Sequence, residues 1–231
     1  MPSFGCAGLQ PTAQVDNNAG TQAMPSYYGP KAKIAVSNFD VKAAKAYGEI
    51  GTGLREMLIT ALVNSNRFRV VERQVLDAVM QEQQLGVSGA AAPGQSGAQR
   101  GQIKTADIIV TAAITEFEPQ ASGGAGGLGG GGSVGGALVG AILGGSLNKA
   151  HMALDLRIID TSTSEVLAAT RVQGQTTDIA GGIFAGVLGS VPLGIGLGGY
   201  ANTPMEKAIR VCIIEAVKYI AQTTPANYFK D

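Results

Sequence analysis

The sequence predicts a mixed α+β domain in which one β-sheet is flanked by helices. Short runs of β-branched and aliphatic residues alternate along the chain with longer segments whose apolar residues recur every three or four positions. The resulting order of elements is β-α-β-α-β-β-β-α. Hydrophobic residues make up 45% of the 231 residues, which is ample for a buried core. Residues 1–30 are predicted to form a polar tether, and residues 31–231 a single domain.

The first half of the domain is predicted as two strand–helix pairs. Residues 31–39 read as a short strand bounded by Pro30, and residues 48–66 as a helix with one apolar stripe. Residues 67–71 form the next predicted strand. Residues 72–85 then form a second helix, with four apolar residues on one face: Val75, Leu76, Val79 and Met80.

The second half supplies three strands and a closing helix. Residues 106–117 are a β-rich apolar run typical of a central strand, and residues 151–160 alternate between apolar and polar side chains. Residues 165–172 return as a partner strand after a Thr/Ser turn. The last helix is predicted over residues 204–221, with Thr203 as N-cap and core-facing residues at Met205, Ala208, Ile209, Ile213 and Val217.

Composition excludes several classes of function. The formal net charge is +0, which gives no long-range field for holding nucleic acid. The chain has one histidine, His151, and two cysteines, Cys6 and Cys212, so no metal site with Cys/His spacing is expected. The acidic residues are distributed as solvated charges usually are, and one histidine cannot be placed beside a reactive nucleophile. We therefore expect neither an enzyme nor a bound cofactor.

Cys6 is the candidate modification site. Gly5 precedes it and small residues follow, as at the end of a bacterial lipoprotein signal, in which the cysteine becomes lipid-modified. Ser3 departs from that motif, because a larger aliphatic residue is usual three positions before the cysteine. The alternative is an unmodified cysteine in a polar tether. Cys212 lies in an apolar run and is expected to be a buried structural thiol.

Two glycine-rich inserts, residues 119–150 and 174–203, interrupt the domain. No charged residue occurs between Glu118 and Lys149 or between Asp178 and Glu206, and more than half of the 34 glycines fall in these inserts. Their apolar side chains need a non-aqueous partner. The candidates for membrane-facing positions are Val134, Leu138, Ile142, Ile183, Val187, Leu193, Ile195 and Leu197.

The structure of the two inserts is left open by the pattern. A spanning helix needs about 20 apolar residues, whereas a spanning strand needs about 9 to 11. In the second insert the apolar residues from Ile183 to Leu197 fall on odd positions, as in a strand with one apolar face. In the first, glycines repeat every four residues from Gly132 to Gly144, as in packed helices. Transmembrane β-hairpins, a helical hairpin, and a loop folded over the domain or into an oligomer interface remain alternatives.

The core together with its inserts resembles the CsgG family of outer-membrane lipoprotein channels that export curli subunits. The resemblance covers nearly the whole chain, and the matching segments are 33–36, 58–62, 68–73, 106–110 and 156–167. It implies a periplasmic α+β domain in a homo-oligomeric ring, a nonamer by the family's example, in which each subunit gives two β-hairpins to a shared barrel. It further implies a lipid anchor in the outer membrane and passive secretion of surface-fibre subunits with accessory secretion proteins.

The resemblance also suggests a loop that lines the pore. In the curli channel a loop between the first strand and first helix projects aromatic and amide side chains inward. Here the corresponding segment is shorter, and Phe39 and Tyr47 are its aromatic candidates. An alternative function for the same fold is a periplasmic lipoprotein adaptor that binds envelope partners without forming a channel.

Overall fold

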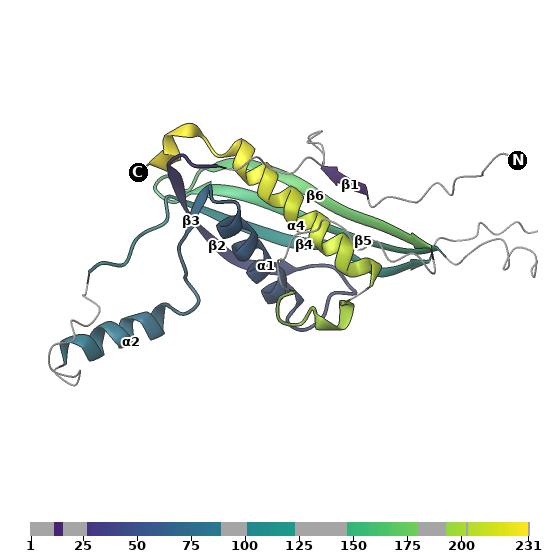
Figure 1. The fold of residues 1–231 in the computed structure, drawn as a ribbon, viewed down its shortest axis with the longest axis horizontal. Coiled ribbons are helices and arrows are strands. Elements are labelled where there is room, and N and C mark those ends of the chain that lie inside the picture. Colours follow the sequence, from purple (N-terminus) through teal and green to yellow (C-terminus); the bar gives the residue numbers. More distant parts are fainter. Residues whose placement is uncertain are drawn as a thin grey trace, which may run out of the picture.

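A single mixed β-sheet with helices on one face organises the computed structural model (Figure 1). The structure describes residues 12–15, 27–88, 101–122, 147–179, 193–201 and 203–230. Within these ranges the sheet has seven strands in the spatial order β1-β6-β5-β4-β2-β3, with β7 paired to β2. The strands are β1 (Thr12–Val15), β2 (Lys31–Val41), β3 (Phe68–Val70), β4 (Ile108–Ser122), β5 (Leu147–Asp160), β6 (Val166–Ile179) and β7 (Phe229–Lys230).

The sheet is mixed, as the sequence predicts. β2 pairs in parallel with β3 and with β4, whereas β4, β5 and β6 form an antiparallel series. A parallel pair needs a crossover connection, and helix α1 (Ile50–Asn64) supplies it between β2 and β3. The α+β fold class is therefore confirmed.

Two helices cover the same face of the sheet. α1 lies over β2 and β3, and α4 (Pro204–Thr223) crosses β5 and β6 while also touching α1 (Figure 1). Two single 3-10 turns, η1 (Gly198–Tyr200) and η2 (Ala226–Tyr228), flank α4 in the sequence. No described helix covers the opposite face, which we call the open face.

Alternation along the strands separates these two faces. In β5, Asp155 and Arg157 are exposed on the open face. The residues that alternate with them are buried under the helices, as predicted: Met152, Leu154, Leu156 and Ile158. The core between sheet and helices therefore follows from the period of two in the sequence.

The start of α4 follows local signals that are visible in the sequence. Thr203 Oγ1 accepts a hydrogen bond from the backbone N–H of Glu206 at 3.4 Å, and Pro204 occupies the first helical turn. The apolar face of α4 is buried at every predicted position: Met205, Ala208, Ile209, Ile213 and Val217. Cys212 is fully buried on the same helix, as predicted.

Helix α2 (Leu76–Val87) forms close to the predicted range but lies away from the sheet (Figure 1). Most of its apolar residues are exposed, Val79 by 41%, Met80 by 50% and Val87 by 61%, whereas Leu76 is half-buried and Gln83 is buried. The prediction that this helix flanks the sheet is therefore wrong. An apolar stripe shows that a helix has a partner, but the stripe does not identify the partner.

The predicted polar tether contains a strand. β1 pairs antiparallel with β6, so that Thr12 lies opposite Gln175 and Val15 opposite Val172. β2 is thus the second strand in the chain and not the first. Four residues are too few for a periodic signal, and the pairing adds a strand to the otherwise free edge of β6.

The C-terminal segment is joined to the end of β5 by a hydrogen bond to a carboxylate. The Tyr228 hydroxyl donates to Asp160 Oδ2, and the backbone N–H groups of Thr163 and Ser162 donate to Asp160 Oδ1 at 2.8 and 2.6 Å. These bonds, that of Tyr228 foremost, lower the pKa of Asp160. The same contact with Asp160 raises the pKa of Tyr228 to about 12.

Tyr228→Phe is expected to raise the pKa of Asp160 toward its ordinary value. A carboxyl pKa that is lower in the folded state stabilises the protein above the unfolded pKa, and this contribution is lost as the pH falls. The variant should therefore lose less stability on acidification than the wild type. NMR titration of the Asp160 carboxyl carbon measures the shift. Tyr27→Phe is the control, since Tyr27 donates to the Pro30 carbonyl, and an unchanged Asp160 pKa in Tyr228→Phe would contradict the prediction.

Candidate functional site

Three neighbouring strands end together at one end of the sheet. The register places Ser122 of β4 beside Asn148 of β5, and Asn148 beside Asp178 of β6. Because both pairings are antiparallel, β4 and β6 run toward this row and β5 runs away from it. The strands converge at the right-hand end of the sheet in Figure 1. Both glycine-rich inserts leave the domain here, and we call this end the insert pole.

The strands extend further into the predicted inserts than expected. Residues 119–122 and 147–150 belong to β4 and β5, and residues 174–179 belong to β6. The insert boundaries at 119–150 and 174–203 are therefore corrected to residues 123–146 and 180–192, which lie outside the described residues. Glycine within β6 blurred the second boundary in the sequence.

β1 directs the N-terminus toward the same pole. Thr12 pairs with Gln175, which is nearer the insert pole, and Val15 pairs with Val172, which is farther from it. The N-terminal end of β1 therefore points toward the insert pole. Cys6 itself lies outside the described residues.

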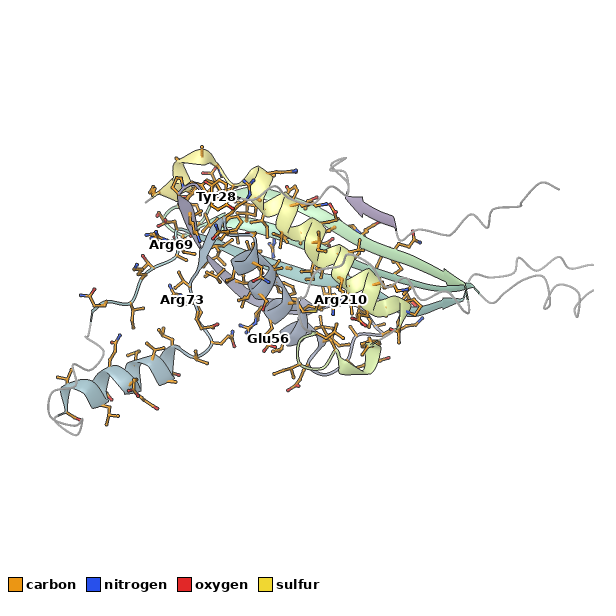
Figure 2. The ribbon with its side chains drawn as sticks, in the orientation of Figure 1. Tyr28, Glu56, Arg69, Arg73 and Arg210 are labelled. Carbon is orange, nitrogen blue, oxygen red and sulfur yellow. The ribbon has the colours of Figure 1, made fainter. Side chains whose placement is uncertain are left out.

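The segment that follows the second insert is fixed to α1. A Cβ built on Gly53 of α1 would lie 2.1 Å from the carbonyl oxygen of Ile195, and one built on Gly194 would lie 2.2 Å from the carbonyl oxygen of Gly53. The two backbones are thus in direct contact, which only glycine permits at both positions. Glu56 of α1 also accepts a hydrogen bond from the Ile195 N–H at 3.4 Å, and its place on the helix is labelled in Figure 2.

A group of charged residues on the open face links the three strands near the insert pole. The carboxylate of Glu116 in β4 contacts His151 of β5 through one oxygen and Arg171 of β6 through the other. Glu118, two residues further along β4, pairs with Lys45. Burial lowers the pKa of His151, and the carboxylate of Glu118 acts in the opposite direction. Such half-exposed pairs contribute about 1 kcal/mol or less each, so they fix the register of the strands more than they stabilise the fold.

The sequence has relatives that identify its family. The family model described as curli production assembly/transport component CsgG matches residues 15–229, which is nearly the whole chain. The chain belongs to the CsgG family. The resemblance stated from the sequence is thereby confirmed.

A curated relative and several solved structures are similar to this CsgG-family chain. The provisionally named lipoprotein NMB1126/NMB1164 of Neisseria meningitidis serogroup B is 28% identical over 207 residues, which cover 85% of this chain and 78% of the relative. Protein XCC0632 from Xanthomonas campestris is 12% identical, with coverage of 88% and 93% and a TM-score of 0.48. A PelC dodecamer from Paraburkholderia phytofirmans is 11% identical, with coverage of 93% and 99% and a TM-score of 0.39.

The predicted membrane-facing residues divide into two groups. Val134, Leu138, Ile142, Ile183 and Val187 lie outside the described residues. Leu193, Ile195 and Leu197 belong to the segment fixed on α1, where Leu197 is fully buried, Leu193 packs against the core and Ile195 is 56% exposed. The alternating pattern therefore does not continue as a strand through residues 193–197, and Leu193 and Leu197 face the domain core.

The two aromatic candidates for a pore loop lie in different environments. Phe39 lies in β2 and its side chain is buried in the core, so the folded domain does not present it in the loop. Tyr47 lies in the loop between β2 and α1 and is 71% exposed. Of the two candidates, Tyr47 alone is exposed in this CsgG-family chain.

The described residues hold no helix long and apolar enough to cross a membrane, and no group of side chains suited to a metal ion. Three features of the site escaped the sequence-based predictions: β1, the contact between Gly53 and Gly194, and the group around Glu116. The glycines at 51 and 53 near the start of α1 were the available signal for the contact between Gly53 and Gly194, because glycine in a helix marks a close approach of another backbone.

Proposed function

We propose that this CsgG-family chain is an outer-membrane lipoprotein that assembles into a homo-oligomeric ring and forms a passive secretion channel. The observation that carries the proposal is the shared insert pole. Both charge-free inserts leave the domain there, and β1 directs the chain toward Cys6 on the same side. A lipid anchor and two apolar segments at one pole would all meet the same bilayer.

The distances along the chain support this arrangement. Five residues lie between Cys6 and Thr12, and the six residue-to-residue steps of an extended chain, at roughly 3.3–3.6 Å each, give a reach of about 20 Å. A diacylglycerol on Cys6 would therefore hold the insert pole close to the membrane surface. The first insert, residues 123–146, is long enough for two spanning strands of about 9 to 11 residues each.

A second function is favoured by the length of the second insert. Only residues 180–192 separate the end of β6 from Leu193, which packs against the core. This length falls short of the roughly 18 to 22 residues that two spanning strands need. A periplasmic lipoprotein adaptor, anchored at Cys6 and binding envelope partners without a pore, would need no second hairpin through the membrane.

Three measurements on the full-length lipidated protein separate the channel from the adaptor. A channel gives rings in negative-stain electron micrographs of the detergent extract, and stepwise conductance in planar bilayers. Its β content by circular dichroism should also rise on transfer from buffer to detergent, because the inserts then pair. A monodisperse monomer without conductance would overturn the channel and leave the adaptor.

Cys6→Ser is expected to release the protein from the outer-membrane fraction and to remove the mass of the lipid from the N-terminal peptide. Cys212→Ala is the matched control and should leave both readouts unchanged. Burial raises the pKa of the Cys212 thiol, which keeps it protonated and unreactive. Cell fractionation and mass spectrometry measure the two effects. An unmodified Cys6 in membrane-bound wild-type protein would contradict the proposed anchor.

A further inference from the structure

Helix α2 and its connections form an arm that reaches away from the sheet. The arm comprises residues 71–88 and 101–107 of the described chain, and no other described helix or strand packs extensively against α2 (Figure 1). Its apolar stripe consists of Val75, Leu76, Val79, Met80 and Val87. Glu82 borders this stripe, and α2 carries acidic residues but no basic ones.

The base of the arm is fixed by hydrogen bonds. Arg73 Nη2 donates to the Lys104 carbonyl at 3.0 Å and so joins the two connections, and Gln74 Nε2 donates to Asn38 Oδ1 of β2 at 2.8 Å. Figure 2 labels Arg73 at this base, between the sheet and α2. The arm is therefore held in its outward direction, and α2 does not fold back over its own sheet.

The open face carries an apolar row that matches the arm. Ala35, Ile109, Ile159 and Val166 lie side by side in β2, β4, β5 and β6. Val166 is 49% exposed. In the next row of β5, Arg157 is exposed and has no carboxylate partner among the described residues. This surface thus combines apolar side chains with the exposed Arg157 and, two residues away in β5, the exposed Asp155, whereas α2 is apolar and acidic.

The base of the arm and the apolar row lie at the same level along the strands, whereas α2 itself lies beyond the ends of the strands, on the side away from the insert pole (Figure 1). One connection follows β3 and the other precedes β4, and both are bonded to β2 next to this row. Val71 N–H donates to the Ile34 carbonyl at 2.7 Å, and Asp107 N–H donates to the Lys33 carbonyl at 3.0 Å. In a ring whose subunits all point the insert pole toward one membrane, each feature keeps its height. The base of each arm therefore lies at the height of the row in the neighbouring subunit, and α2 reaches that neighbour from there.

We propose that α2 of one subunit docks on the open face of a second copy, against Ile109, Ile159 and Val166, with Glu82 beside Arg157. This inference rests on the ring of the proposed function and identifies its subunit contact. The contact joins two different surfaces, so it is heterologous and closes only as a ring or continues as a filament. The docked helix would add a third layer to the two-layer domain.

Charge placed at the contact tests the proposal in the full-length protein in detergent. Val79→Glu and Val166→Glu should each raise the protein concentration for half-assembly by roughly tenfold or more, as for burial of an unpaired charge at an interface. Gln81→Glu, on the opposite side of α2, and Gln173→Glu, on the open face nearer the insert pole, are the matched controls. Arg157→Glu should weaken assembly, and Glu82→Arg should restore it. Assembly is followed by sedimentation velocity.

Cross-linking identifies which chain supplies the helix. Separately purified Met80→Cys and Val166→Cys proteins, mixed and treated with a short bismaleimide, should give a covalent dimer that neither variant gives alone. A cross-link formed only within one chain that carries both substitutions would overturn docking on a second copy. If Val79→Glu assembles like the wild type, the contact is wrong while the ring stands. A monomeric wild-type protein would contradict the proposed ring as well. Liposome flotation of the same proteins tests the membrane anchor separately.

Discussion

Gly174→Val is expected to lower the free energy of unfolding by about 3 kcal/mol, at the upper end of the cost of overpacking a core. A Cβ at Gly174 would lie 2.0 Å from the carbonyl oxygen of Ala208 and 2.9 Å from the Cβ of Cys212. Both neighbours belong to α4, and the nearer atom is backbone, which cannot rotate away. The helix would have to lift from β6. Urea denaturation followed by circular dichroism measures the loss.

Gly198→Ala is the matched control for this substitution. Nothing lies within 4 Å of a Cβ built on Gly198, so the variant should stay within about 0.5 kcal/mol of the wild type. Wild-type stability in Gly174→Val would mean that α4 does not approach β6 as closely as described. By the same reasoning, Gly53→Ala tests the contact between α1 and the segment that follows the second insert.

Phe117→Ala is expected to cost about 3–5 kcal/mol, the usual range for removing a buried aromatic ring. Phe117 is 1% exposed and lies in β4 where the strand approaches the first insert. Its ring meets that of Tyr200 edge-on, with centroids 5.3 Å apart. Tyr200 comes shortly after the second insert, so one aromatic pair joins the bases of both inserts. If the inserts enter a membrane as proposed, loss of the Phe117 ring should also reduce binding to liposomes in a flotation assay.

Tyr200→Phe separates the two effects of this pair. It keeps the ring, and the Tyr200 hydroxyl has no hydrogen-bond partner among the described residues, so stability should change by less than about 0.5 kcal/mol. Tyr200→Ala should reproduce part of the Phe117→Ala loss. If Phe117→Ala unfolds at the wild-type urea concentration, the ring is not part of the core.

Local signals in the sequence predicted those helices and strands whose cap or repeating apolar pattern lies within the element itself. The cap of α4 at Thr203 and the alternation along β5 both encode their own structure, and both predictions are confirmed. α2 shows the limit of this reasoning. Its apolar stripe is equally compatible with a core and with another subunit, and the direction is decided by hydrogen bonds at Arg73 and Gln74 that span distant residues.

The sequence suggested positions for the candidate site but none of its contacts. The absence of charge located both inserts and the small-residue context singled out Cys6, yet neither pattern reports long-range packing. Leu197 continues an alternating pattern in the sequence and is nevertheless buried, because Gly53 and Gly194 allow its segment to lie on α1. β1 is stabilised by an existing strand edge and not by its own four residues.

The pairing of β4 with β5 also has a consequence for the order of events during biogenesis. Ser122 and Asn148 are neighbours in the folded sheet, so the residues that flank 123–146 are already a strand spacing apart once the domain has folded. The entropy loss of closing that loop therefore occurs when the domain folds. In the proposed channel, formation of a hairpin in the bilayer would then be a local and rapid step, with the folded domain as its template.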